Sequence, residues 1–73
     1  MKNSIISVFK TSVSSKKKIL SLRPYLNNLK NIRQWNFDLE DRDRILRIDS
    51  DSPVSVTVIG ILNRRGFDCI ELD

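Results

Sequence analysis

The 73-residue sequence contains no histidine and only one cysteine, Cys69. These absences remove the side chains that most soft-metal sites and many nucleophilic active sites use. There is also no glycine-rich phosphate loop and no nucleophile with a plausible base beside it, so we expect a protein that is not an enzyme. A single cysteine cannot build a disulfide scaffold and is consistent with a reducing cytosol.

Long hydrophobic runs are absent as well. No segment approaches the roughly 20 apolar residues that a membrane-spanning helix needs. The opening segment, M-K-N-S-I-I-S-V-F-K, has too short an apolar stretch for a signal peptide. We therefore expect a cytoplasmic protein with no membrane span.

The composition is that of a small globular domain. A chain of 73 residues allows one domain, residues 1–73, with a thin hydrophobic core. The formal net charge is +4, but much of the charge lies in a mixed cluster, Glu40 to Arg47, that is typical of solvated surface. The one coherent positive block, Lys16 to Lys18, falls short of the basic face of a nucleic-acid binder, so we expect no nucleic-acid partner.

The first half of the chain predicts a strand followed by a helix. Ile5 to Thr11 is rich in β-branched and aromatic residues, which favour a strand. From Lys16 to Leu29, apolar residues recur at spacings of three and four and share one helical face. Pro24 removes a backbone donor within this helix, so we expect a kink there. The residues on the apolar face are Ile19, Leu22, Leu26 and Leu29.

The middle of the chain predicts a hairpin. Apolar and polar residues alternate from Ile32 to Leu39, which places Trp35 and Phe37 on the buried face of a strand. A polar turn separates this strand from a second one, Arg44 to Asp49. A loop follows, in which Ser52 is the expected N-cap of the next helix, with proline in the first helical position.

Residues 54–63 carry conflicting signals. Their valines alternate with polar residues, which favours a strand by propensity alone. The spacing of Val58, Ile59 and Leu62 and a glycine at the left-handed C-cap position, Gly66, favour a helix. We predict a helix, followed by a short strand from Phe67 to Leu72. The resulting order is that of an α+β ferredoxin-like sandwich, a four-stranded antiparallel sheet with two helices on one face.

Three segments of the chain stand out as motifs: V-S-S-K-K-K after the first strand, R-P-Y-L-N-N-L-K-N-I-R-Q-W-N-F-D-L-E across the first helix and second strand, and I-L-N-R-R-G-F-D-C near the end. Together they resemble the heavy-metal-associated domain family of copper chaperones and metal-pumping ATPases. The resemblance covers nearly the whole chain. It implies that Val13 is a buried apolar residue, that Ser15 and Lys18 stand at the two metal-binding cysteines, and that Phe67 lies near this loop.

A serine hydroxyl and a lysine ammonium cannot replace the two thiolates that hold a soft ion such as Cu(I). The resemblance therefore implies a domain that has lost its metal ligands, binds no metal or cofactor, and acts as a protein-interaction module. The alternative is a metal-trafficking protein that binds metal weakly or with a partner's ligands. We interpret Cys69 as a small buried hydrophobic residue.

The serine- and lysine-rich loop is one candidate binding surface. Exposed backbone N–H groups at a helix N-terminus, together with three lysines, could bind an anion or a partner. The alternative, which we favour, is that the lysines are a solvated helix start. The residues of this loop are Ser14, Ser15, Lys16, Lys17 and Lys18.

The open face of the sheet is the second candidate. If Phe9 points toward the helices, the strand period of two turns Ile6 and Val8 outward, and Ile45 and Ile70 could join them. Exposed aliphatic patches mark interfaces. We therefore expect a homodimer or a larger protein partner on this face.

Overall fold

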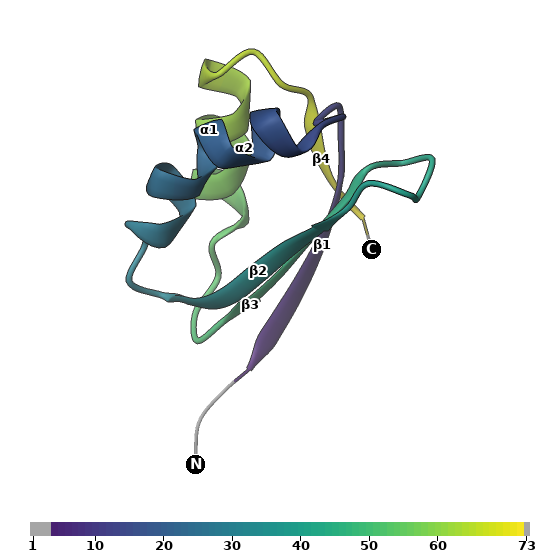
Figure 1. Cartoon of the computed structure of the whole chain (residues 1–73). Coiled ribbons are helices and arrows are strands. Elements are labelled where there is room, and N and C mark those ends of the chain that lie inside the picture. The colour runs from purple at the N-terminus through teal and green to yellow at the C-terminus, as the bar shows by residue number, and fades with distance from the viewer. Residues whose placement is uncertain (1–3, 73) are drawn as a thin grey trace.

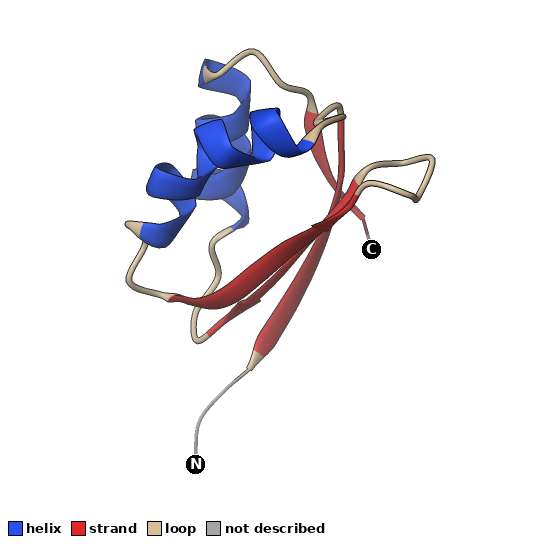
Figure 2. Cartoon of the chain, in the orientation of Figure 1, coloured by secondary structure: helices blue, strands red, loops and turns tan. Residues whose placement is uncertain are grey.

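The computed structural model describes residues 4–72, which form one antiparallel sheet and two helices (Figure 1). The strand order is β2-β3-β1-β4, and both helices lie on one side of the sheet (Figure 2). This arrangement confirms the predicted ferredoxin-like sandwich. The elements are β1 (Ile5–Thr11), α1 (Lys16–Asn27), β2 (Ile32–Asp38), β3 (Ile45–Ser50), α2 (Ser55–Arg64) and β4 (Cys69–Leu72).

The core lies between the sheet and the helices. Phe9 of β1 and Leu46 of β3 are fully buried on the helix-facing side of the sheet. Leu22 and Leu26 of α1 and Leu62 of α2 are fully buried against them, as the helical spacing predicts. Burying one such side chain contributes about 1.5–3 kcal/mol, so these few residues supply a large part of the stability.

The aromatic residues of β2 pack on this core but are only half-buried, because β2 is an edge strand. The rings of Trp35 and Phe37 meet edge to face, with centroids 6.0 Å apart. Trp35 Nε1 also donates a hydrogen bond to Asn27 Oδ1 at 2.9 Å, which ties the end of α1 to the sheet. Both residues therefore belong to the packed side of the sheet.

Residues 55–64 form the helix α2, so the helix prediction for residues 54–63 is confirmed and the strand propensity of its valines is overridden. Helical rotation separates the valines: Val54 and Val58 are buried, whereas Val56 is 88% exposed. The predicted C-cap is confirmed, because Gly66 adopts a φ of 88°. Its N–H donates to the Asn63 carbonyl at 3.0 Å, and the next N–H, of Phe67, donates to the Leu62 carbonyl at 2.9 Å.

The predicted start of α2 is wrong. Ser52 is not the N-cap, since the helix begins at Ser55 and the cap residue is Val54, whose side chain makes no capping hydrogen bond. Val54 is buried and its carbonyl accepts from Val58 N at 2.9 Å, so packing rather than capping sets the entry point. The Ser52 carbonyl instead accepts a hydrogen bond from the Ser50 hydroxyl at 2.8 Å.

The other boundaries differ from the predictions by a few residues. α1 ends at Asn27, two residues before Leu29, and β4 begins at Cys69, two residues after Phe67. Pro24 lies inside α1, which is assigned as one helix, so the kink stays a prediction. In residues 4–72, no helix is both long and apolar enough to cross a bilayer.

Candidate functional site

The loop between β1 and α1 is anchored at its start by Thr11. The Thr11 hydroxyl donates to the Arg44 carbonyl at 2.7 Å and accepts from Val13 N at 3.2 Å. Its backbone N–H donates to the Asp43 carbonyl at 3.1 Å. These bonds join the loop to the turn between β2 and β3.

A second anchor joins the same loop to the segment between α2 and β4. Ser12 N donates to the Asp68 carbonyl at 3.2 Å, and Asp68 N donates back to the Ser12 hydroxyl at 2.8 Å. Val13, the next residue, is fully buried in the core, and Phe67 is half-buried against that core. The loop is thus held by backbone pairing and by an apolar side chain.

Ser15 is the N-cap of α1. Its backbone is extended, with φ −150° and ψ 158°, and its Oγ accepts a hydrogen bond from Lys18 N at 3.2 Å. The hydroxyl satisfies one of the free N–H groups that every helix start carries. The Ser15 side chain therefore stabilises the start of α1.

The first turn of α1 is strongly cationic. Lys16, Lys17 and Lys18 are all exposed, and no acidic residue lies in this turn. Lys18 Nζ donates to Ser14 Oγ at 3.1 Å, which holds one ammonium group over the loop. The positive end of the helix dipole adds to this field, so the electrostatic potential at the loop is positive. Whether it attracts anions stays a prediction.

Cys69 lies beside this loop, because it pairs with Thr11 across β4 and β1. Its side chain is buried, and burial raises the pKa of the thiol to about 11, with a smaller contribution from the negative charge of Glu71. The thiolate, which is the form that binds soft metals, is therefore scarce at neutral pH. Over residues 4–72, no group of three or more histidine, cysteine or acidic side chains is placed to hold a metal ion.

The open face of the sheet has an aliphatic half on β1 and β4. Ile6 and Ile70 are each 61% exposed, and Val8 is half-buried. Leu72, which sequence reasoning missed, pairs with Val8 and is 38% exposed. The period of two from Ile70 could have identified it.

The prediction that Ile45 belongs to the exposed patch is wrong. Ile45 lies on the open face, opposite Lys10 and Asp38, but only 6% of it is exposed. Ile45 has a paired strand on each side, whereas Ile70 lies on the edge strand β4 and Ile6 lies beyond the part of β1 that pairs with β4. On the same face, Lys10 of β1 forms an ion pair with Asp43 of the turn between β2 and β3, at 3.7 Å.

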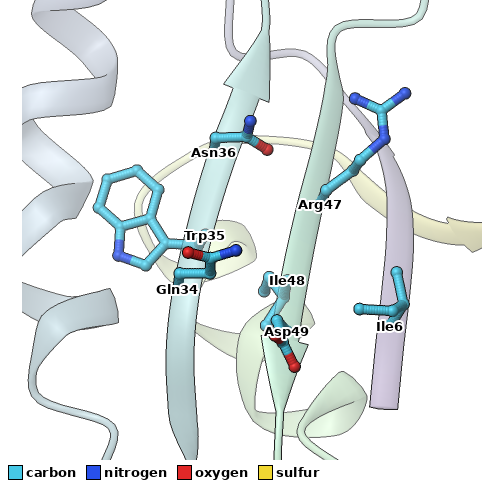
Figure 3. A pocket seen from close by; sticks show the side chains of 7 residues that line it. All are labelled: Ile6, Gln34, Trp35, Asn36, Arg47, Ile48 and Asp49. Atoms are coloured by element: carbon cyan, nitrogen blue, oxygen red, sulfur yellow. The ribbon is translucent and has the colours of Figure 1, made fainter. Parts of the chain in front are cut away.

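The polar half of the open face lies on β2 and β3 and contains a surface pocket (Figure 3). Two charged side chains line the pocket, Arg47 and Asp49. Sequence reasoning missed Arg47, because it took the cluster from Glu40 to Arg47 as solvated surface. The Trp35 ring lies on the other side of β2 from Arg47 and Ile6 in Figure 3. The lining residues are Ile6, Gln34, Trp35, Asn36, Arg47, Ile48 and Asp49.

No family model matches the chain, and no curated protein matches it. Among solved structures, it is similar to the apo form of the HMA domain of the copper chaperone for superoxide dismutase. The TM-score is 0.74 at 12% sequence identity, and the match covers 99% of this chain and 70% of that one. At this identity the likeness shows the fold, which is that of an HMA domain.

Proposed function

Starting from this HMA-like fold, we propose that the chain is a protein-interaction module without a soft-metal site and without enzymatic activity. The observation that carries the proposal is the use of Ser15 and Lys18 in the loop between β1 and α1. One side chain caps the helix and the other places an ammonium group over the loop. We place the module in the cytoplasm, where Cys69 would stay reduced.

The donor set of this loop does not fit Cu(I). A soft ion needs two thiolates, and the loop offers hydroxyls and ammonium groups instead. The Ser15 hydroxyl already accepts a backbone hydrogen bond, and the nearby thiol of Cys69 has a pKa of about 11. Capturing a metal here would require ionising that thiol and displacing the cap against the charge of three lysines.

The surface that supports binding is the open face of the sheet. Its exposed aliphatic side chains, Ile6, Ile70 and Leu72, are the kind that mark protein interfaces. The aromatic residues of β1 and β2, Phe9, Trp35 and Phe37, belong to the helix-facing side, so this face has no platform on which bases could stack. A protein partner therefore fits the face better than a nucleic acid.

The test is an amide chemical-shift titration of the reduced protein with Cu(I) and with Zn(II). A Ser15→Cys, Lys18→Cys double variant serves as the matched control, because it restores two thiols at the loop. We expect shifts at residues 14–19 in the double variant only. A response of the unmodified protein near Ser15 or Cys69 would refute the proposal. Phosphate, used as a third titrant, tests the anion hypothesis at the same residues.

The alternative function is metal trafficking with ligands supplied in part by a partner. The likeness to the HMA domain of a copper chaperone favours it. It predicts that the melting temperature of the unmodified protein rises with metal concentration, because a ligand that binds only the folded state stabilises it. Our proposal predicts no such rise.

A further inference from the structure

Arg47 lies in a row of side chains that crosses the open face from a polar end to an apolar end. The register places Asn36 beside Arg47 on one side and Val8 on the other, and Leu72 lies beyond Val8. Adjacent strands are about 4.8 Å apart, so the guanidinium-bearing residue and the aliphatic pair are close neighbours. The row offers a positive charge next to an apolar strip.

The Arg47 side chain has no direct partner within the described residues. It is exposed, and within residues 4–72 its guanidinium group makes no hydrogen bond or ion pair. Asp38 and Glu40 line a hollow together with Arg47 but form no ion pair with it. Two other charged side chains of this face are engaged: Asp49 accepts from the Ser4 hydroxyl at 2.8 Å and lies 3.9 Å from Arg33, and Lys10 pairs with Asp43. Among the described residues of this face, Arg47 is therefore a cation that a partner could engage.

We propose that the open face binds an extended protein segment that carries a carboxylate between aliphatic side chains, with Arg47 as the partner of the carboxylate. The inference rests on the proposed function and names the chemistry of its partner. Side chains of an extended segment alternate, so a carboxylate and the aliphatic residues two positions away lie on one side. The guanidinium group binds a carboxylate through two parallel hydrogen bonds. The aliphatic side chains cover Ile6, Val8 and Leu72.

A second copy of the chain is a poorer occupant. A stable interface buries about 800 Å² per partner, a substantial share of the 5160 Å² accessible surface of the chain. The aliphatic half of this face offers only a few side chains for such an interface. A second copy would also bring carboxylates that are already engaged. Asp49 has the partners given above, and Asp38 accepts from Glu40 N at 3.2 Å.

The experiment is an amide chemical-shift titration with a synthetic peptide, acetyl-Val-Ser-Glu-Ser-Val-amide, in which the glutamate and both valines lie on one side of the extended chain. Its counterpart carries glutamine in place of the glutamate. Arg47→Gln removes the proposed contact. Arg23→Gln is the matched control, since it makes the same change at an exposed arginine on α1. Both positions are exposed, so both variants are expected to fold, which their amide spectra check.

We expect the glutamate peptide to shift the amides of Ile6, Val8 and Arg47. Arg47→Gln should raise the Kd for the glutamate peptide about five-fold, which corresponds to the loss of one exposed ion pair, and Arg23→Gln should leave this Kd unchanged.

Equal binding of the two peptides overturns the inference about Arg47 but does not contradict the proposed interaction module. The absence of shifts on the open face with either peptide also overturns the inference. The metal titration tests the proposed function separately. Concentration-dependent shifts at these residues without peptide would identify a second copy as the occupant and also overturn the inference.

Discussion

Two isoleucines on the same face of the sheet should respond very differently to the same substitution. Ile45→Asp places a carboxylate at a position that is 6% exposed, whereas Ile6→Asp places it at one that is 61% exposed. Full burial of an isoleucine side chain contributes about 1.5–3 kcal/mol, and burying a carboxylate without a partner adds a cost of several kcal/mol. We expect Ile45→Asp to lower the free energy of unfolding by about 4 kcal/mol or more, and Ile6→Asp by about 1 kcal/mol.

The difference is large compared with the total stability, which is about 4–11 kcal/mol for a chain of this length. Urea unfolding followed by the fluorescence of Trp35, the single tryptophan, measures it directly, because that ring packs between α1 and the sheet. With a slope of about 1 kcal/mol per molar urea, the midpoint of Ile45→Asp should lie about 3 M below that of Ile6→Asp. Similar midpoints for the two variants would show that the burial of Ile45 is not as described.

Three further predictions concern the loop, the end of α2 and the buried thiol. Ser15→Ala should remove the N-cap of α1, which costs about 1 kcal/mol of stability and lowers the melting temperature by about 4–8 °C. Ser14→Ala should change the melting temperature little. Equal melting temperatures of the two variants in calorimetry would contradict the capping role of Ser15. Gly66→Ala should lower the free energy of unfolding in urea by about 1–2 kcal/mol, because Gly66 has a φ of 88°. Gly60→Ala should raise it by about 0.5–1 kcal/mol, because Gly60 lies inside α2 and its nearest neighbour is the flexible end of an arginine. A stability gain from both variants would argue against the left-handed cap at Gly66. The pKa of Cys69 rises from 9.0 to about 11 on folding, so the thiol ionises more readily in the unfolded chain. Its contribution to the free energy of unfolding should therefore be constant below pH 9 and be lost between about pH 9 and 11. Cys69→Ala should lack this part of the loss, and superimposable pH profiles for the two proteins would refute it.

The elements themselves were predictable because hydrophobic periodicity is a local property. The spacing of Leu22 and Leu26 in α1 and the alternation around Phe9 in β1 directly reflect which side chains meet the core. Local signals misled at Ser52, since the serine-proline pair is a good helix start in isolation but the burial of Val54 moves the helix start to Ser55. Packing outweighed capping at that boundary.

The candidate site was only partly predictable, because its properties depend on register and on neighbours distant in sequence. The period of two placed Ile45 on the open face, but its burial depends on the strands that pair on both sides of it. The role of Arg47 depends on which residues lie beside it on β1 and β2, and the sequence does not state that pairing. For the loop, the residue types at Ser15 and Lys18 were informative once the family resemblance had aligned them with two metal-binding positions, since a hydroxyl and an ammonium group cannot hold a soft ion in any fold.

The loop between β1 and α1 contains residues that anchor the chain path, followed directly by residues that contribute little to stability. Thr11 and Ser12 hold the chain path through partners 33 and 56 residues away, and Val13 holds it through the core. The five residues that follow contribute little beyond one cap, so replacing them costs about 1 kcal/mol of a much larger total. Substitutions can therefore change the side chains of residues 14–18 with little loss of stability. The same tolerance makes this stretch a suitable place for a designer to graft a new recognition sequence.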